Sequence, residues 1–290
     1  MKVLLICPDE RTGVSALADS VPLSNVAILG KSVVEYWIEH LATMGATEIL
    51  VLAADRPDQV RNAVGDGARW GLSVTVKSEK RERTIAEARA KYVTNDRSTW
   101  LPAPNDVILA DHLPGLPRSP LFTSYADWFA AVRTWTLHAM TPDRIGLHEL
   151  RPGVWAGLHA RIALNVKLIG PCWIGDYVWI EAGATIGPDA VLEKEAFVAR
   201  GASVSASVIG PKTFVGQFTE IRNSIAWGCT LINWERDSCL KVTDEFLLCS
   251  LEPPRARQAL AETSGMPRLR EYVSQFLTSA FGKSDPPQSP

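Results

Sequence analysis

The chain has 290 residues, 46% of them apolar, and a formal net charge of −2 at pH 7, which leaves room for two domains and argues against a surface dedicated to nucleic acid. The sequence contains no apolar run near the ~20 residues that a membrane-spanning helix needs, and its first residues do not resemble a signal peptide. Its five cysteines are scattered without CxxC spacing, which argues against a disulfide framework or a zinc site, so we expect a cytoplasmic protein.

The first part of the chain alternates short apolar runs with amphipathic segments. The runs predict four buried strands of a parallel sheet, at Lys2–Cys7, Glu48–Leu52, Leu72–Val76 and Asp106–Ala110. The amphipathic segments predict helices at Ser32–Met44, Pro57–Val64, Thr84–Tyr92 and Ser124–Met140. Two of these helices begin with a Ser or Thr that is followed three residues later by Glu, the pattern of a capping box. The alternation predicts a doubly wound α/β domain over residues 1–145.

Ligands of such sheets bind beyond the carboxyl ends of the strands. Two segments meet this condition: the loop Pro8–Gly13 after the first strand, and Asp111 after the fourth. A carboxylate at that place is suited to hold Mg²⁺. The alternative interpretation of Asp111 is an ordinary turn or cap residue.

From Ile162 to Ile225 the sequence repeats every six residues. One position of the repeat is aliphatic: Ile162, Leu168, Ile174, Ile180, Ile186, Leu192, Val198 and Val204. A small or β-branched residue follows four positions later, whereas an antiparallel sheet would alternate with a period of two. Three such units make one coil of about 18 residues in a parallel β-helix, so we expect this fold over residues 150–251.

The end of the chain is expected to close the β-helix, because a solenoid needs a cap at its open end. Asp244–Leu251 predicts a last strand or a cap, and Pro254–Thr263 and Arg268–Phe281 predict two helices, giving a helical cap over residues 252–283. The second helix has an apolar stripe: Leu269, Tyr272, Val273, Phe276 and Leu277. Residues 284–290 are polar and proline-rich, which is typical of a disordered tail.

Three segments carry a resemblance to a known family: Gly30 to Leu41, Gly45 to Val51, and Gly65 to Leu72, which reads GDGARWGL. They are similar to the first part of the sugar-1-phosphate nucleotidyltransferases, or NDP-sugar pyrophosphorylases. Members of that family follow the sheet with a left-handed β-helix, which is the order of elements predicted here. By layout, the chain resembles a shortened and divergent form of the bifunctional N-acetylglucosamine-1-phosphate uridyltransferase and acetyltransferase.

The resemblance implies an activity and a set of partners. Family members join a nucleoside triphosphate to a sugar 1-phosphate and release pyrophosphate with Mg²⁺. Aligned on this family, the nucleotide-binding loop includes Arg11, Thr12 and Gly13, and Asp111 takes the place of the metal ligand. A nucleotide or sugar nucleotide is the expected ligand. The resemblance also implies a homo-trimer through the β-helix, for which Trp173 and Trp179 are candidate outward contacts unless one of them packs under the sheet domain.

The chain departs from the family at the residues that carry its chemistry. Pro8 and Asp9 replace two early glycines of the loop, the position of the loop arginine is Gly13, and the position of the signature lysine is Leu23. A proline has no N–H to donate, and a leucine cannot neutralise a phosphoryl group. The segment after Asp111 is also short, so the sugar-binding half of the family domain looks deleted.

The β-helix resembles the acyltransferase half of the bifunctional family between Ile209 and Ile225. Arg222 and Asn223 hold two of its places and Trp234 takes that of a tyrosine, but the general-base histidine falls on Leu231. These residues predict a vestigial acyl site.

Three functions remain open. The chain is expected to be a non-catalytic scaffold or regulatory relative in nucleotide-sugar or polysaccharide metabolism, with no catalytic residue assigned. The alternatives are an active sugar-1-phosphate nucleotidyltransferase and a hexapeptide-repeat acyltransferase.

Overall fold

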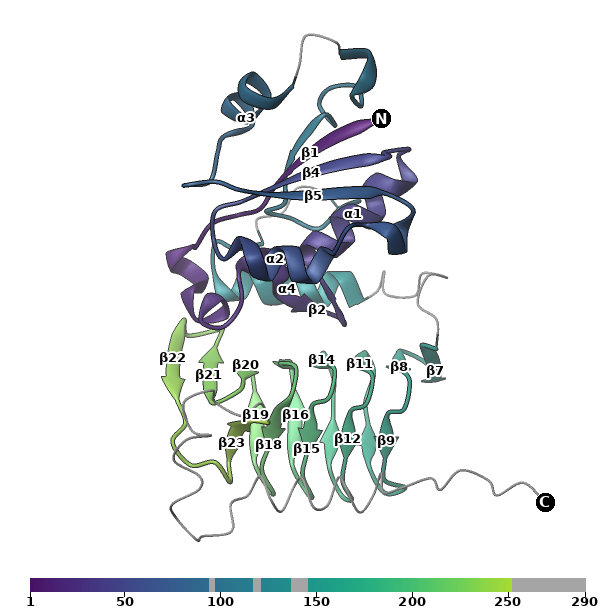
Figure 1. Ribbon diagram of the computed structural model, residues 1–290. Coiled ribbons are helices and arrows are strands. Elements are labelled where there is room, and N and C mark those ends of the chain that lie inside the picture. Colours follow the sequence, from purple (N-terminus) through teal and green to yellow (C-terminus); the bar gives the residue numbers. More distant parts are fainter. Residues whose placement is uncertain (94–96, 117–120, 137–145, 252–290) are drawn as a thin grey trace, which may run out of the picture.

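The computed structural model describes residues 1–93, 97–116, 121–136 and 146–251 (Figure 1). The predicted helical cap 252–283, the tail 284–290 and the end of the predicted helix Ser124–Met140 lie outside these residues. An α/β part lies over one side of a stack of short strands (Figure 1). In the described part of the chain, no helix combines the length and the apolar character that a bilayer crossing requires.

The α/β part is built on a parallel sheet with strand order β5-β4-β1-β6. Its strands are β1 (Lys2–Ile6), β4 (Glu48–Ala53), β5 (Ser73–Ser78) and β6 (Val107–Leu109). Alternate residues of β1 enter two different cores, because Val3 packs with the helices α1 and α4 whereas Leu4 packs with α3. The predicted parallel sheet is therefore confirmed, and it is covered on both faces.

Helices α1 (Val33–Thr43), α2 (Pro57–Val64) and α4 (Tyr125–Thr136) lie between this sheet and the strand stack, and α3 (Ile85–Tyr92) lies on the other face (Figure 1). Both predicted capping boxes are present, at Ser32 with Glu35 and at Thr84 with Glu87. The remaining short elements of this part are η1 (Thr12–Ala18), η2 (Leu23–Asn25), β2 (Ala27–Ile28), β3 (Lys31–Ser32), η3 (Ala68–Trp70) and η4 (Arg97–Thr99).

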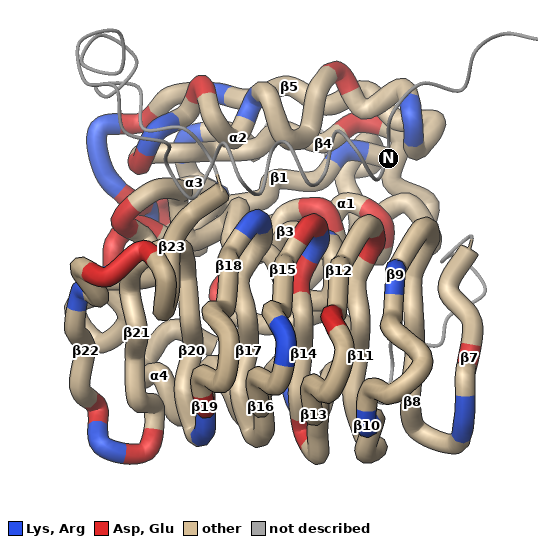
Figure 2. The backbone as a smooth tube through the Cα atoms, turned by 90° about the horizontal axis from the view of Figure 1, so that it is seen from below, with Lys and Arg blue, Asp and Glu red and all other residues tan. Residues whose placement is uncertain are grey.

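The six-residue repeat folds into parallel strands that stack in three columns (Figure 2). Its strands are β8 (Val154–Ala156), β9 (Arg161–Ile162), β10 (Lys167–Leu168), β11 (Cys172–Ile174), β12 (Trp179–Ile180), β13 (Thr185–Ile186), β14 (Ala190–Leu192), β15 (Phe197–Val198), β16 (Ser203–Ser205), β17 (Ser207–Ile209), β18 (Thr213–Val215), β19 (Glu220–Arg222) and β20 (Ser224–Trp227). From β8 to β17, each strand pairs with the third strand after it, as in the register of Ile162 with Ile180 and of Ile180 with Val198. The aliphatic residues of the repeat form the interior core. This arrangement is compatible with the predicted β-helix, and its left-handed sense stays a prediction.

Antiparallel strands close both ends of the stack within the described residues. At the first coil, β7 (His148–Arg151) pairs with β8. At the last coil, β20 continues into β21 (Thr230–Asn233) and β22 (Ser238–Lys241), and β23 (Leu248–Ser250) pairs with β18. The strand expected within Asp244–Leu251 is therefore present as β23.

The α/β part is fixed to the outer face of the eight-stranded column, which has the order β22-β21-β20-β17-β14-β11-β8-β7. Glu193 is fully buried there, and its two carboxylate oxygens accept the backbone N–H groups of Leu29 at 2.6 Å and Gly30 at 2.8 Å. Trp173 is 4% exposed and lies under Gly30, where an added Cβ would be 3.2 Å from the indole ring. Trp173 is therefore buried between the strand stack and the α/β part of the same chain, and it is not an outward contact for a trimer.

Candidate functional site

The carboxyl edge of the parallel sheet brings together most of the residues that the sequence singled out. Arg11 follows β1, and its Nη2 donates to both carboxylate oxygens of Glu82, at 2.8 and 2.7 Å. Its Nη1 donates to the carbonyl oxygens of Asp9 and Glu10, at 3.1 and 3.3 Å. Glu82 also accepts the backbone N–H of Asp9 at 2.7 Å. The guanidinium of Arg11 is thus engaged by groups of its own chain.

Thr12 and Gly13 do not form an open loop, because they begin the short helix η1. Gly13 lies against the backbone that precedes α4, where an added Cβ would be 1.9 Å from the carbonyl oxygen of Thr123. Val14 and Leu17 of η1 point into the core. The segment that the sequence predicts as a nucleotide-binding loop is therefore packed against the rest of the sheet domain.

Asp111 lies directly beyond β6, as predicted. Its Oδ1 is 2.7 Å from Nδ1 of His112, whose carbonyl oxygen accepts the indole N–H of Trp37 at 2.7 Å. Among the described residues, no group of three or more His, Cys, Asp or Glu side chains is arranged to hold a metal ion. One carboxylate that already bonds a histidine is a poor Mg²⁺ site by itself, because Mg²⁺ takes six oxygen ligands and needs a substrate to complete them.

Two further arginines at this edge are also paired. Arg56 donates to both oxygens of Asp55, at 2.8 and 2.7 Å, and to the carbonyl oxygens of Ala18 and Val21, at 2.7 and 3.0 Å. It therefore holds the segment that follows η1 in place.

Arg83 donates to Glu79 at 2.7 Å. The hydrogen bonds from Arg83, Tyr92 and Lys91 lower the pKa of Glu79 to about 2. Glu79 therefore stays ionised at neutral pH and keeps the cations of Arg83 and Lys91 engaged.

The side chains beneath the edge are apolar or inert. Leu23, at the position of the family lysine, is fully buried in the core. Cys7 follows β1 and is 3% exposed, and burial raises the pKa of its thiol to about 12. A thiol with that pKa is not a nucleophile at neutral pH.

The residues of the predicted acyl site are close in the chain, but their side chains point to different partners. The backbone N–H of Trp234 donates to the carbonyl oxygen of Asn223 at 3.2 Å. The side chain of Asn223, however, donates to Glu235 at 2.7 Å, and Arg222 pairs with Glu220. The indole of Trp234 donates to the carbonyl oxygen of Ala206 at 3.0 Å. These side chains are thus engaged by different groups of the same chain, and the vestigial acyl site stays a prediction.

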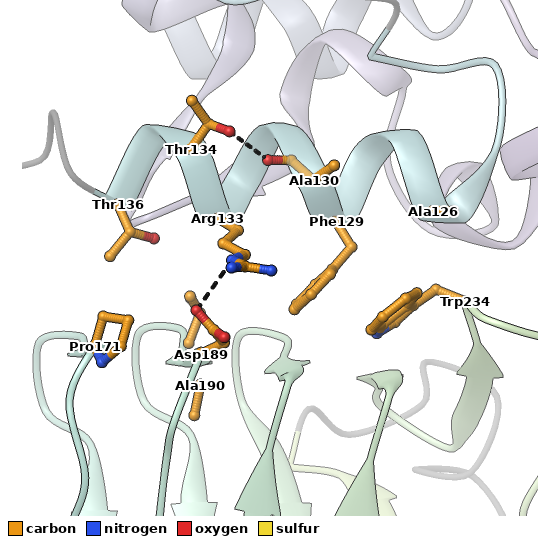
Figure 3. Close-up of a pocket in the computed structure, with 11 residues that line it drawn as sticks. Ala126, Phe129, Ala130, Arg133, Thr134, Thr136, Pro171, Asp189, Ala190 and Trp234 are labelled. Carbon is orange, nitrogen blue, oxygen red and sulfur yellow. Dashed lines mark hydrogen bonds and ion pairs between the residues drawn. The ribbon is translucent and has the colours of Figure 1, made fainter.

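Trp234 instead belongs to a cavity of about 490 Å³ between α4 and the eight-stranded column (Figure 3). Its ring stacks on Phe129 with centroids 4.6 Å apart and planes inclined by 12°. Arg133 reaches from α4 to Asp189, with 3.2 Å between Nε and Oδ1. The hydroxyls of Thr134 and Thr136 donate to carbonyl oxygens of α4 itself. The cavity therefore offers apolar walls and one ion pair, which suits binding rather than acid–base chemistry.

The sequence did not predict this cavity or the contact of Glu193 with the backbone of Leu29 and Gly30. The cavity residues belong to no motif, since they come together only when α4 lies on the strand column. Glu193 had one local signal, because Leu192 stacks between Ile174 and Ile209, which are followed by Gly175 and Gly210.

Comparisons with known proteins support the coarse resemblance. No family model matches the chain. Over 88 residues it is 31% identical to the glucose-1-phosphate thymidylyltransferase of Streptomyces antibioticus, a match that covers 30% of this chain and 25% of that protein. The match thus spans a quarter of the length of this relative. The likeness supports a distant relation to the nucleotidyltransferases of sugar metabolism, and the finer resemblance to the bifunctional family stays an expectation.

Proposed function

We propose that this chain is a relative of the sugar-1-phosphate nucleotidyltransferases that lacks pyrophosphorylase turnover and serves as a scaffold or regulatory subunit in nucleotide-sugar metabolism. The observation that carries this proposal is the pairing of Arg11 with Glu82. Phosphoryl transfer depends on cations that are placed to neutralise the transferring phosphate. Arg11 is the cation of the predicted nucleotide loop, and its donors are directed to one carboxylate and two carbonyl oxygens of the same chain.

The rest of the edge supports the same conclusion. Pro8 provides no N–H for a phosphate, and Asp9 and Glu10 add negative charge beside the place where it would bind. Arg56 and Arg83 are each paired with a carboxylate. A triphosphate would therefore have to compete with three internal carboxylates for its cations.

The alternative is an active sugar-1-phosphate nucleotidyltransferase. It is favoured by Asp111, which lies beyond β6 where a metal ligand of this sheet would lie, and by the thymidylyltransferase relative. In this case Arg11 would leave Glu82 when the nucleotide binds. The acyltransferase alternative has less support, because Leu231 packs against the interior core of the stack.

Pyrophosphate release separates these functions. The full chain is incubated with Mg²⁺, each common nucleoside triphosphate and a panel of sugar 1-phosphates, and released pyrophosphate is measured at high protein concentration. We expect no release above the protein-free blank. Release that disappears in Asp111→Asn but persists in Asp58→Asn, an exposed carboxylate of α2, would establish the active alternative.

Calorimetry of the same samples tests the regulatory form of the proposal. Binding of a nucleoside triphosphate or a sugar nucleotide without turnover would support a regulatory role that senses this ligand. Absence of both binding and turnover would leave only the scaffold role.

A further inference from the structure

The outer face of the five-stranded column carries a row of three aromatic rings and one cysteine, here named the aromatic ladder: Trp179, Phe197, Phe214 and Cys249. Adjacent members are in register across β12, β15, β18 and β23. The rings of Trp179 and Phe197 stack at 6.1 Å between centroids, and those of Phe197 and Phe214 stack at 5.5 Å. Their chain neighbours Ile180, Val198 and Val215 belong to the interior core, so the ladder points outward.

The ladder differs from the other two outer faces of the stack. The eight-stranded column is covered by the α/β part. The four-stranded column presents Lys167, Thr185, Ser203 and Glu220 in register, which is a polar face suited to water. In the five-stranded column, β9 presents Arg161 beside the ring of Trp179, and the other four strands present the ladder, which is the remaining apolar face.

Three of the four ladder residues are as buried as a covered layer, and Trp179 is partly buried. Phe197 is 5% exposed, Phe214 4% and Cys249 6%. Among the described residues, their cluster contains only members of this column and Leu251, which directly follows β23. Stacked neighbours within one sheet cover the faces of a ring and leave its outward edge open, so a further layer is required over this face of the stack.

The last described residues of the chain lie at this face. β23 is the last described strand and lies in the five-stranded column. The backbone N–H of Leu251 donates to the carbonyl oxygen of Lys212 at 2.7 Å, and its side chain contacts the ladder cluster. Residues 252–290 follow from this point, and they contain the apolar stripe of residues 269–277.

We propose that residues 268–281 form an amphipathic helix that lies across the aromatic ladder with its apolar stripe on the rings. Fourteen helical residues span about 21 Å, and four strands that lie ~4.8 Å apart span about 14 Å. Residues 252–267 can extend to about 50 Å, so reach is not a constraint. Antiparallel strands already close the last coil, which leaves the side of the stack, rather than its end, as the place where this helix is needed.

The first test measures the reactivity of Cys249 in the full chain. A maleimide labels the protein for increasing times, and mass spectrometry of the peptides gives the rate at each cysteine. Phe276→Asp places a charge in the apolar stripe, and Thr278→Asp places the same charge on the opposite side of the helix. We expect Phe276→Asp to accelerate labelling of Cys249 by about tenfold or more, because a buried charge displaces the helix, and Thr278→Asp to leave the rate unchanged.

Buried Cys7 and Cys172 report in the same experiment whether the protein has unfolded globally, since their rates should not change unless it does, and exposed Cys229 and Cys239 serve as the internal standard for labelling. Equal Cys249 rates in the two variants would overturn the proposal. The proposal would also be overturned if the wild-type protein sedimented as an oligomer and Cys249 became reactive when that oligomer dissociated on dilution. In that case a second copy of the chain would cover the ladder.

A second test does not depend on destabilising the protein. A cysteine is introduced as Val273→Cys in the stripe or as Thr278→Cys outside it, and a short bis-maleimide is added to the dilute full chain. We expect an intramolecular cross-link between position 273 and Cys249, and none from position 278. Cross-linking of both positions to the same extent, or of neither, would contradict the proposed orientation.

Discussion

Among the polar residues at the contact between the α/β part and the strand stack, Glu193 is expected to be the one whose substitution lowers the free energy of unfolding most. Its carboxylate is fully buried, and each oxygen accepts one backbone N–H of the turn at Leu29 and Gly30, at 2.6 and 2.8 Å. Glu193→Ala would leave both N–H groups without this acceptor. A buried donor that loses its acceptor costs about 1–3 kcal/mol. The free energy of unfolding should therefore fall by about 2–6 kcal/mol, a large part of the 5–15 kcal/mol that is typical of a domain.

Equilibrium unfolding in urea, followed by tryptophan fluorescence and by far-UV circular dichroism, measures this loss. Trp173 lies beneath Gly30 and reports the same contact. Glu193→Gln keeps the shape of the side chain and one carbonyl oxygen, so we expect roughly half the loss of the alanine variant. Glu195→Gln is the matched control, because this carboxylate lies two residues away and is partly exposed.

The control should change the free energy of unfolding by no more than about 0.5 kcal/mol. A loss in Glu193→Ala that is no larger than that of the control would refute the reasoning. It would mean that water or a shifted turn replaces the carboxylate at little cost, and that the apolar contacts alone hold the two parts together.

Three further predictions concern the carboxyl edge of the sheet. Gly13→Ala should lower the free energy of unfolding by about 1–3 kcal/mol, measured by urea denaturation, because its Cβ would be 1.9 Å from a backbone oxygen; a neutral result would show that η1 can move. The pKa of Glu79 is lowered to about 2 from 4.5, so its pairing with Arg83 should stabilise the protein fully above pH 4.5 and be lost as the pH falls towards 2; Glu79→Gln should flatten this part of the pH–stability curve. Glu82→Gln removes the charge that holds Arg11, so calorimetry should show inorganic triphosphate binding about 3–10 times more tightly than to the unchanged protein; unchanged affinity would mean that Arg11 does not face the ligand site.

Local patterns account for the features that could be predicted. The strands of the parallel sheet appear where continuous apolar runs occur, because a strand buried on both faces needs apolar residues at consecutive positions. The capping boxes at Ser32 and Thr84 depend on a residue and its third neighbour. The six-residue period of the stack is also a local pattern. Each aliphatic residue is in register with the one three repeats later, as Ile162 is with Ile180.

The candidate site was predicted only in part. Asp111 lies beyond β6 as expected, because the end of a strand can be located from its apolar run. The state of Arg11 could not be anticipated, since its partner Glu82 lies 71 residues away and belongs to the loop after β5. The residues next to an arginine in the sequence do not show whether its guanidinium is available to bind a phosphate or is already paired with a distant carboxylate.

The sequence by itself determined which segments become strands and helices and how the coils stack, because these depend on residues within one repeat or one helical turn. Only the tertiary structure decided how the faces of the stack are used. The apolar contact of Trp173 under Gly30 and the buried carboxylate of Glu193 exist only when residues more than 140 positions apart in the chain come together. Two faces of the stack can carry the same inward-pointing residues and still be covered by different elements. The cover depends on the outward-pointing side chains, which the repeat does not constrain.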